Sequence, residues 1–416
     1  MSSHTDPHGA PTPPPPALPP LGTGGPGPAP GGAGGSGVHA AHQLVSGHVS
    51  IHKLLLGMRK VNASDLHIKV GMPPIYRVGG LLKVLPMDPL GPDEADHLLD
   101  PIVPEALAAR FATSGDLDFA CYNAEGDRFR VNMFRAGAHV AAAIRRVKAD
   151  IPDFKQLHLP PIYADLVEKT NEGLILVVGV TGCGKSSTLA AMINHINHTQ
   201  AVHIITVEDP VEYRFIPDKA IISQRELGID VPDYRTALRY IVRQDPDIVF
   251  IGELRDLDTV MAAIQAAETG HLVFATMHTA DTMQSFGRML EFFPQSERAF
   301  VRSALGTSLK AIMAQRLLPA VENFEVSVVP ATEVLLNNAI CRAKILEGDD
   351  GALPSVIAGS TNEGMRSFTT SLAELVNKDW VSKRVAMEYA PNREALDSIL
   401  KGMQVKASTM VGKLKM

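Results

Sequence analysis

Short segments in which apolar and polar residues alternate dominate the chain between residues 46 and 149. Alternation at period two is typical of strands with one buried face, and glycine-containing pairs between such segments mark turns. The predicted strands are 67–70, 75–78 and 129–134, with turns at 79–80 and 126–127 and helices at 93–99 and 104–111. We therefore predict a small α+β domain over 46–149, followed by a proline-containing linker over 150–160.

From residue 161 to 416 the pattern changes to an alternating α/β body. The run 174–178 is apolar at every position, which is typical of a strand covered on both faces of a parallel sheet. Strands that alternate with helices predict a mostly parallel sheet with helices packed on it. The other predicted strands are 203–207, 248–251, 272–276 and 328–336, and the predicted helices are 185–196, 259–268, 297–318, 368–376 and 393–400.

The first 45 residues are predicted to form a tail without a packed core. Of residues 1–40, 21 are Pro or Gly, and Asp6 is the only charged residue. Such a segment has too little apolar surface to offset its ordering entropy. A solvated tail is one interpretation, and a partner-binding polyproline arm at Pro13 to Pro16 is the other.

Charge and composition exclude several classes of function. The formal net charge is −6, with 39 Lys and Arg against 45 Asp and Glu, which argues against a broad basic face for nucleic acid. No apolar run approaches the ~20 residues of a membrane span, and no signal peptide is visible, so we expect a cytoplasmic protein without direct membrane insertion. Three scattered cysteines cannot build a disulfide framework or a zinc module.

The strongest chemical signal is a phosphate-binding loop between an apolar strand and an amphipathic helix. Residues 179–186 match GxxxxGK[ST] in full. Glycines let backbone N–H groups turn toward a phosphate, a lysine adds a point charge, and a serine hydroxyl can ligate Mg²⁺. The predicted nucleotide-binding residues are Gly179, Val180, Thr181, Gly182, Cys183, Gly184, Lys185, Ser186 and Ser187. Cys183 is either an ordinary loop residue or a redox-sensitive thiol.

Acidic residues and histidines follow the later strands, where doubly wound sheets bind their ligands. A cluster at 208–212 ends in Glu212, and Glu253 follows the strand at 248–251. Each acid either works on the metal and the attacking water or has a structural role, which for Glu253 would be to cap the next helix. His278 lies beyond the end of the strand at 272–276 and His271 lies at its start, so the two histidines do not suit a shared metal site.

Taken together, these motifs resemble the PilT-type ATPases, which retract bacterial type IV pili and belong to the wider group of secretion ATPases. The resemblance covers about residues 46 to 402. The matching segments are 179–187, 203–213, 243–247, 252–256, 268–272 and 276–279, with 63–67, 73–74 and 128–132 in the N-terminal region. It implies a RecA-like P-loop core, a PAS-like N-terminal domain, a helical C-terminal region and a ring-shaped homohexamer that acts on an inner-membrane pilus platform protein.

The resemblance also implies roles for single residues. Glu212 matches the general base, and Glu253 matches the acid that positions Mg²⁺ and water on ATP. His278 matches the residue near the γ-phosphate, with His271 supporting its loop. Arginines near the phosphates or at subunit contacts are matched by Arg225 and Arg243, and those that reach a neighbour's nucleotide by Arg128, Arg130 and Arg145. A surface ion pair is the alternative for each arginine.

One departure from the family pattern keeps another motor function open. The retraction signature of the form AIRNLIRE is reduced to fragments at 339–347, which makes an accessory paralogue of the PilU kind an alternative. Assembly and secretion relatives carry a four-cysteine zinc insertion that three scattered cysteines cannot form. A nucleotide sensor without motor activity is an alternative of another class, and a nucleic-acid translocase is disfavoured by the net charge.

Overall fold

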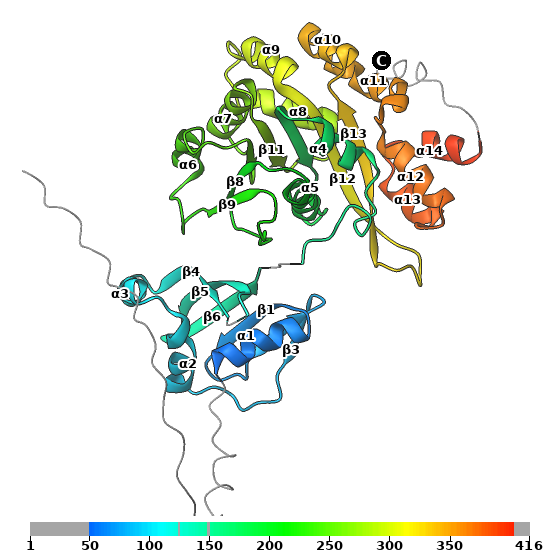
Figure 1. The fold of residues 1–416 in the computed structure, drawn as a ribbon. Helices are drawn as coiled ribbons and strands as arrows, with labels where there is room; N and C mark the ends of the chain where they lie inside the picture. The colour runs from blue at the N-terminus through cyan, green and yellow to red at the C-terminus, as the bar shows by residue number, and fades with distance from the viewer. Residues whose placement is uncertain (1–49, 124, 148–149, 403–416) are drawn as a thin grey trace, which may run out of the picture. The chain divides into compact units, whose positions relative to one another are not determined.

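The computed structural model describes residues 50–123, 125–147 and 150–402 of the chain. The predicted tail lies outside the described residues. Figure 1 shows two separate sheets, one built from the N-terminal region (blue to cyan) and one from the region beyond residue 173 (green to yellow). Among the described residues, no helix combines the length and apolar character needed to cross a membrane.

The N-terminal sheet is antiparallel throughout, with the strand order β3-β2-β1-β6-β5-β4. Phe129, Val131 and Met133 of one strand are buried and the residues between them are not, as the alternation predicts. The first helix buries Leu55 and Met58 against this sheet. The elements are α1 (Ile51–Lys60), β1 (Ala63–Lys69), β2 (Ile75–Val78), β3 (Leu81–Val84), α2 (Pro92–Leu99), the short 3-10 helix η1 (Asp100–Ile102), α3 (Glu105–Ser114), β4 (Asp116–Tyr122), β5 (Arg128–Ala136) and β6 (His139–Arg146).

The larger sheet has the order β13-β12-β7-β11-β10-β8-β9, and only β13 runs antiparallel to its neighbour. Successive residues of the inner strands enter two different cores, one on each face. This double burial explains why β7 is apolar at every position. The strands are β7 (Gly173–Val178), β8 (His203–Glu208), β9 (Ile221–Glu226), β10 (Ile248–Ile251), β11 (Leu272–Met277), β12 (Leu309–Pro319) and β13 (Val328–Leu336).

Helices cover both faces of this sheet and continue into a helical C-terminal region (Figure 1). Tyr163 of α4 and Leu189 of α5 belong to one core, and Leu238 of α6 and Leu305 of α9 belong to the other. The helices are α4 (Ile162–Lys169), α5 (Lys185–Thr199), α6 (Tyr234–Ile241), α7 (Leu257–Glu268), α8 (Thr282–Glu291), α9 (Arg298–Ser308), α10 (Ala339–Glu347), α11 (Leu353–Gly359), α12 (Phe368–Asn377), α13 (Lys383–Tyr389) and α14 (Arg393–Leu400), with the short 3-10 helices η2 (Asp350–Ala352) and η3 (Thr361–Glu363).

The predicted helix over 297–318 is wrong in its second half. Helix α9 ends at Ser308, and residues 309–319 form β12, which pairs in parallel with β7. The segment is rich in Leu, Ala, Met, Gln and Arg, which favour helices in isolation. Pairing with β7 and β13 overrides that local preference, and successive residues of β12 enter the two cores, so the strand need not alternate.

Candidate functional site

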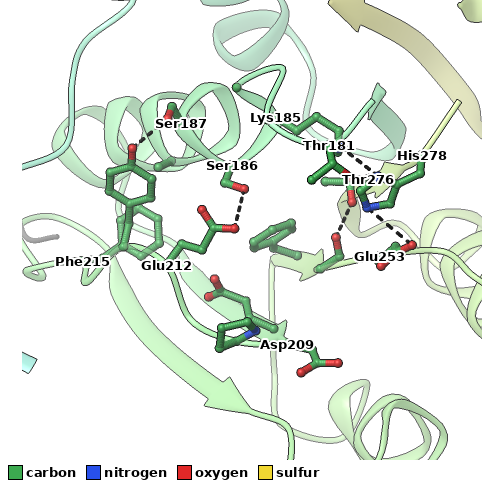
Figure 2. Close-up of a pocket in the computed structure, with 18 of the residues that line it drawn as sticks. Thr181, Lys185, Ser186, Ser187, Asp209, Glu212, Phe215, Glu253, Thr276 and His278 are labelled. Atoms are coloured by element: carbon green, nitrogen blue, oxygen red, sulfur yellow. Dashed lines mark hydrogen bonds and ion pairs between the residues drawn. The ribbon is translucent and has the colours of Figure 1, made fainter. Parts of the chain in front are cut away.

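A pocket of about 430 Å³ lies at the carboxyl ends of the parallel strands β7, β8, β10 and β11. Its wall combines the loop after β7 with residues that follow the other three strands. Figure 2 shows the side chains of Lys185, Ser186, Glu212, Glu253 and His278 converging on it. The topology therefore brings together the motifs that the sequence separates by almost 100 residues, as expected for strands whose carboxyl ends share one edge.

The loop after β7 has the close packing that its glycines permit. Gly179 has φ +151, and a Cβ there would overlap both Cys183 Sγ and the backbone oxygen of Gln315. The loop ends at Gly184, the N-cap of α5, so the positive end of that helix faces the pocket. The geometry matches the predicted phosphate-binding loop, because any side chain at Gly179 would push the loop out of shape.

Lys185 is folded back into this loop. Its Nζ donates to the backbone oxygens of Gly179 at 2.8 Å and Val180 at 3.3 Å, and lies 3.4 Å from His278 Nδ1. Burial lowers the pKa of Lys185. Cys183 is also buried, and burial raises the pKa of its thiol, which opposes the thiolate that redox chemistry needs. These facts favour the ordinary structural interpretation of Cys183.

Glu212 reaches the start of α5 from the loop that follows β8. Ser186 Oγ donates a hydrogen bond of 3.0 Å to Glu212 Oε1 (Figure 2). The flanking Val211 and Tyr213 are buried while Glu212 is exposed, so the loop is anchored on both sides of the carboxylate. Tyr213 OH adds a 2.7 Å hydrogen bond to Ser187 Oγ of α5.

Glu253 lines the same pocket and does not cap the following helix. The N-cap of α7 is Asp256, whose carboxylate accepts from Thr259 N at 2.9 Å. Glu253 instead lies 3.7 Å from His278 Nε2 and 3.6 Å from Arg255 Nε. The capping alternative for Glu253 is thereby removed, and Glu253 lines the pocket together with His278, while its action on metal and water stays a prediction.

One acid of the first cluster is enclosed in the protein. Glu208 is 6% exposed and accepts from Thr206 Oγ1 at 2.6 Å and from Gln224 Nε2 at 3.2 Å. Burial raises the pKa of Glu208 to about 7. Its neighbour Asp209 accepts from Arg255 Nη2 at 2.8 Å. The cluster thus divides into a buried acid, an ion-paired acid and the exposed Glu212.

Comparison with known proteins assigns the chain to a family. A family model for type II/IV secretion system proteins matches residues 128–354, more than half of the chain. The chain belongs to the type II/IV secretion system protein family. It is 35% identical over 342 residues to the type IV pilus retraction ATPase PilT of Pseudomonas aeruginosa, covering 82% of this chain and 98% of that protein.

Two further relatives of this secretion-family chain match at similar levels. The type IV pilus ATPase PilU of Pseudomonas aeruginosa is 35% identical over 353 residues, covering 85% of this chain and 92% of that protein. The crystal structure of the pilus retraction motor PilT with bound ADP aligns with a TM-score of 0.76 at 38% identity, covering 84% of this chain and 99% of that one. The predicted resemblance and the predicted fold class are confirmed.

The two histidines of this secretion-family chain lie at opposite ends of β11, as their positions in the sequence predict. His278 follows β11 and lines the pocket, where Thr181 Oγ1 lies 3.4 Å from its Nδ1. His271 precedes the strand, at the opposite end. Its Nδ1 lies 3.0 Å from both the Ala266 oxygen and Thr269 Oγ1 at the end of α7. The structure therefore separates His271 from the pocket, because a strand's two ends lie on opposite edges of its sheet.

The structure does not bring the five predicted arginines into the pocket formed by this chain. Arg225 of β9 donates to Gln244 Oε1 at 3.5 Å, and Arg243 follows α6 as an exposed residue. In the N-terminal sheet, Arg128 and Arg130 lie on β5, where Arg130 is 3.8 Å from Asp118. Arg145 of β6 donates to Asp65 at 2.8 Å. Their action on a nucleotide, in this or a neighbouring subunit, stays a prediction.

Sequence reasoning missed one residue that holds the phosphate loop. Gln315 is 1% exposed, donates from Nε2 to the Cys183 oxygen at 2.8 Å and accepts from Thr188 Oγ1 at 3.0 Å. It ties the loop and the start of α5 to β12. No local sequence pattern indicates this role, because it depends on the strand β12, and the segment was predicted to be helical. Arg255, which links Asp209 to Glu253, could have been singled out as the residue between two acids at 253 and 256.

Proposed function

We propose that this protein is an ATP-hydrolysing motor subunit of the type IV pilus machinery that drives pilus retraction. The observation that carries the proposal is the contact between Ser186 Oγ and Glu212 Oε1 at 3.0 Å, beside a complete phosphate loop. It places a carboxylate at the start of α5, where a P-loop protein holds the terminal phosphates. The PilT relatives supply the biological setting.

The residues of the pocket divide the chemistry among them. Lys185, released from the Gly179 and Val180 oxygens, binds the β- and γ-phosphates together with the backbone N–H groups of the loop. Glu212 accepts a proton from the water that attacks the γ-phosphate. His278 lies between Lys185 and Glu253, so it orients the groups that face the same phosphate.

The oxygen donors around Ser186 suit Mg²⁺. Among residues 50–402 that the structure describes, no cluster of three or more His, Cys, Asp or Glu could hold a metal ion. Mg²⁺ commonly takes only one or two protein oxygens, completed by phosphates and water, and the Ser186 hydroxyl beside Glu212 offers such donors. When bound, Mg²⁺ neutralises charge on the phosphates. Ser186 and Glu253, which line the same pocket, are the proposed ligands.

The proposed working form is a homohexamer at the cytoplasmic face of the inner membrane, acting on the pilus platform protein. In such a ring, Arg128, Arg130, Arg145, Arg225 and Arg243 act from subunit contacts, which is consistent with their positions outside this chain's own pocket. The net charge of −6 argues against nucleic acid as the partner.

An accessory motor of the PilU kind is the second candidate. The chain is 35% identical to both PilT and PilU, so identity does not separate the two. The fragmentary signature at 339–347 forms α10, on which Ile340 and Leu346 are exposed. A nucleotide sensor without hydrolysis is the third candidate, and the presence of both Glu212 and Glu253 in the pocket argues against it.

Phosphate release by the purified full chain tests the proposal. We expect ATP-dependent release that requires Mg²⁺ and is not increased by DNA. Retraction should then be restored in a pilus-bearing strain that lacks its own retraction motor. Tight ATP binding without release would support the sensor, and release without restored retraction would support the accessory motor.

A further inference from the structure

The side chain of Gln224 on β9 forms hydrogen bonds with the loop that carries Glu212 and with the buried Glu208. Its Nε2 donates to the Tyr213 oxygen at 2.8 Å, and its Oε1 accepts from the Phe215 N–H at 3.0 Å. The second Nε2 hydrogen is donated to Glu208 Oε1 at 3.2 Å. One side chain thus fixes two backbone groups that follow Glu212 within three residues.

The register of the sheet explains why Gln224 can do this. Strands β8 and β9 are parallel, and Gln224 pairs with Thr206, two residues before Glu208. The loop that joins β8 to β9 brings the backbone at 213–215 within hydrogen-bond distance of the Gln224 amide. Thr206 Oγ1 donates to the same Glu208 oxygen at 2.6 Å, which fixes the third partner of the amide.

We propose that Gln224 is a positioning residue that holds Glu212 in place for catalysis, an inference that rests on the proposed ATP hydrolysis. Its hydrogen bonds go to Tyr213, Phe215 and Glu208, so its effect on Glu212 passes through the backbone of Tyr213 and Phe215. Glu212 is exposed, so without this support its carboxylate would sample a wider range of positions.

A second anchor keeps the loop attached when Gln224 is replaced. Tyr213 is buried and its OH is bonded to Ser187 Oγ at 2.7 Å, and Phe215 is buried as well. Loss of the Gln224 amide should therefore loosen the path of the loop without detaching it. Nucleotide binding, which depends on the loop at 179–186, should be preserved.

The substitution Gln224→Met removes the amide and keeps the length of the side chain. We expect kcat for phosphate release to fall by ~10-fold or more, while the dissociation constant of a fluorescent ATP analogue changes by less than about 2-fold. Amide exchange should become faster at Phe215 and stay unchanged at 179–187. The matched control is Gln200→Ala, since Gln200 donates a single 3.2 Å hydrogen bond to Val167 O outside the pocket.

A double-mutant cycle with Glu212→Gln separates positioning from a general loss of structure. If Gln224 acts through Glu212, adding Gln224→Met to Glu212→Gln should change the remaining rate by less than about 2-fold. Equal losses in both backgrounds, a parallel loss of nucleotide affinity, or full activity of Gln224→Met would overturn the inference. An inactive wild type would overturn the proposed hydrolysis and this inference together, whereas an active wild type with a fully active Gln224→Met would overturn the inference alone.

Discussion

The two edges of the seven-stranded sheet carry similar residue types, but the side chains have different contacts at each edge. At the amino edge, polar side chains bind strand and helix ends: His271 Nδ1 lies 3.0 Å from the Ala266 oxygen, and Asp247 accepts from the His203 N–H at 2.8 Å. At the carboxyl edge, Ser186 binds Glu212, and His278 lies between Lys185 and Glu253. Side chains there face one another across a pocket.

Volume does not distinguish the two edges. A hollow of about 520 Å³ lies at the amino edge and is comparable in size with the pocket at the carboxyl edge, which has about 430 Å³. It is lined by Lys169, Thr170, Asn171, Glu172, Gly270 and Lys310. Lys310 there lies 3.6 Å from Glu172, and among the described residues that line the hollow, none belongs to a glycine-rich loop or a helix start. The chemistry of the lining, rather than its size, identifies the functional edge.

Replacing the lysine at each edge should give the largest functional difference between the two edges. Lys185→Ala removes the charge that faces the phosphates, so we expect nucleotide affinity and turnover to fall by ~100-fold or more. Lys310→Ala removes a charge of the same sign at the amino edge and should leave both within about 2-fold. Isothermal titration and phosphate release measure the two effects, and equal losses in the two variants would contradict the assignment.

The two histidines should show a smaller contrast of the same kind. His278→Ala removes a group 3.4 Å from Lys185 Nζ and 3.7 Å from Glu253, and we expect kcat to fall by roughly 10-fold. His271→Ala should instead cost about 1 kcal/mol of stability through its lost hydrogen bond, with turnover unchanged. Urea unfolding and steady-state kinetics report the two quantities. A catalytic loss in His271→Ala would restore the role that the family resemblance implies.

The buried acid at the carboxyl edge should affect stability more than turnover. Burial raises the pKa of Glu208 from 4.5 to about 7, so the folded protein holds this proton more tightly than the unfolded chain does. The resulting stabilisation is complete below pH 4.5 and is lost as the pH rises through about 7. Glu208→Gln keeps an acceptor oxygen for Thr206 and Gln224 and removes this dependence.

Relative to wild type, Glu208→Gln should therefore gain up to about 3 kcal/mol in unfolding free energy as the pH rises from about 5 to 8. Turnover should stay within a few-fold. Chemical denaturation at several pH values measures the difference, and the exposed Glu268→Gln serves as the control. A difference that is constant over this range would show that Glu208 does not hold its proton in the folded state.

Much of the carboxyl edge could be predicted from the sequence because its elements are locally encoded. The apolar run of β7, the glycine loop and the amphipathic α5 each carry their own signal. Strand β12 does not, because its helix-favouring residues become a strand only between β7 and β13. Gln315 was therefore missed, since its role depends on a pairing that no local pattern records.

Of the contacts around the acids, one could be predicted from the sequence and others could not. Glu253 and Asp256 are both acids near the start of α7, and Asp256 is the one that caps the helix. The capping box formed by Asp256 and Thr259 could have been found in the sequence and would have removed that alternative. The hydrogen bonds of Gln224 could not, because they join β9 to a loop that irregular backbone brings close.

Single-turnover hydrolysis by Glu212→Gln tests the central claim, that the carboxylate bonded to Ser186 activates water at the carboxyl edge. We expect ATP affinity within about 3-fold of wild type and a hydrolysis step slower by ~100-fold or more. The control is Glu172→Gln at the amino edge, which should match wild type in both. A Glu212→Gln protein that hydrolyses bound ATP at the wild-type rate would contradict the account.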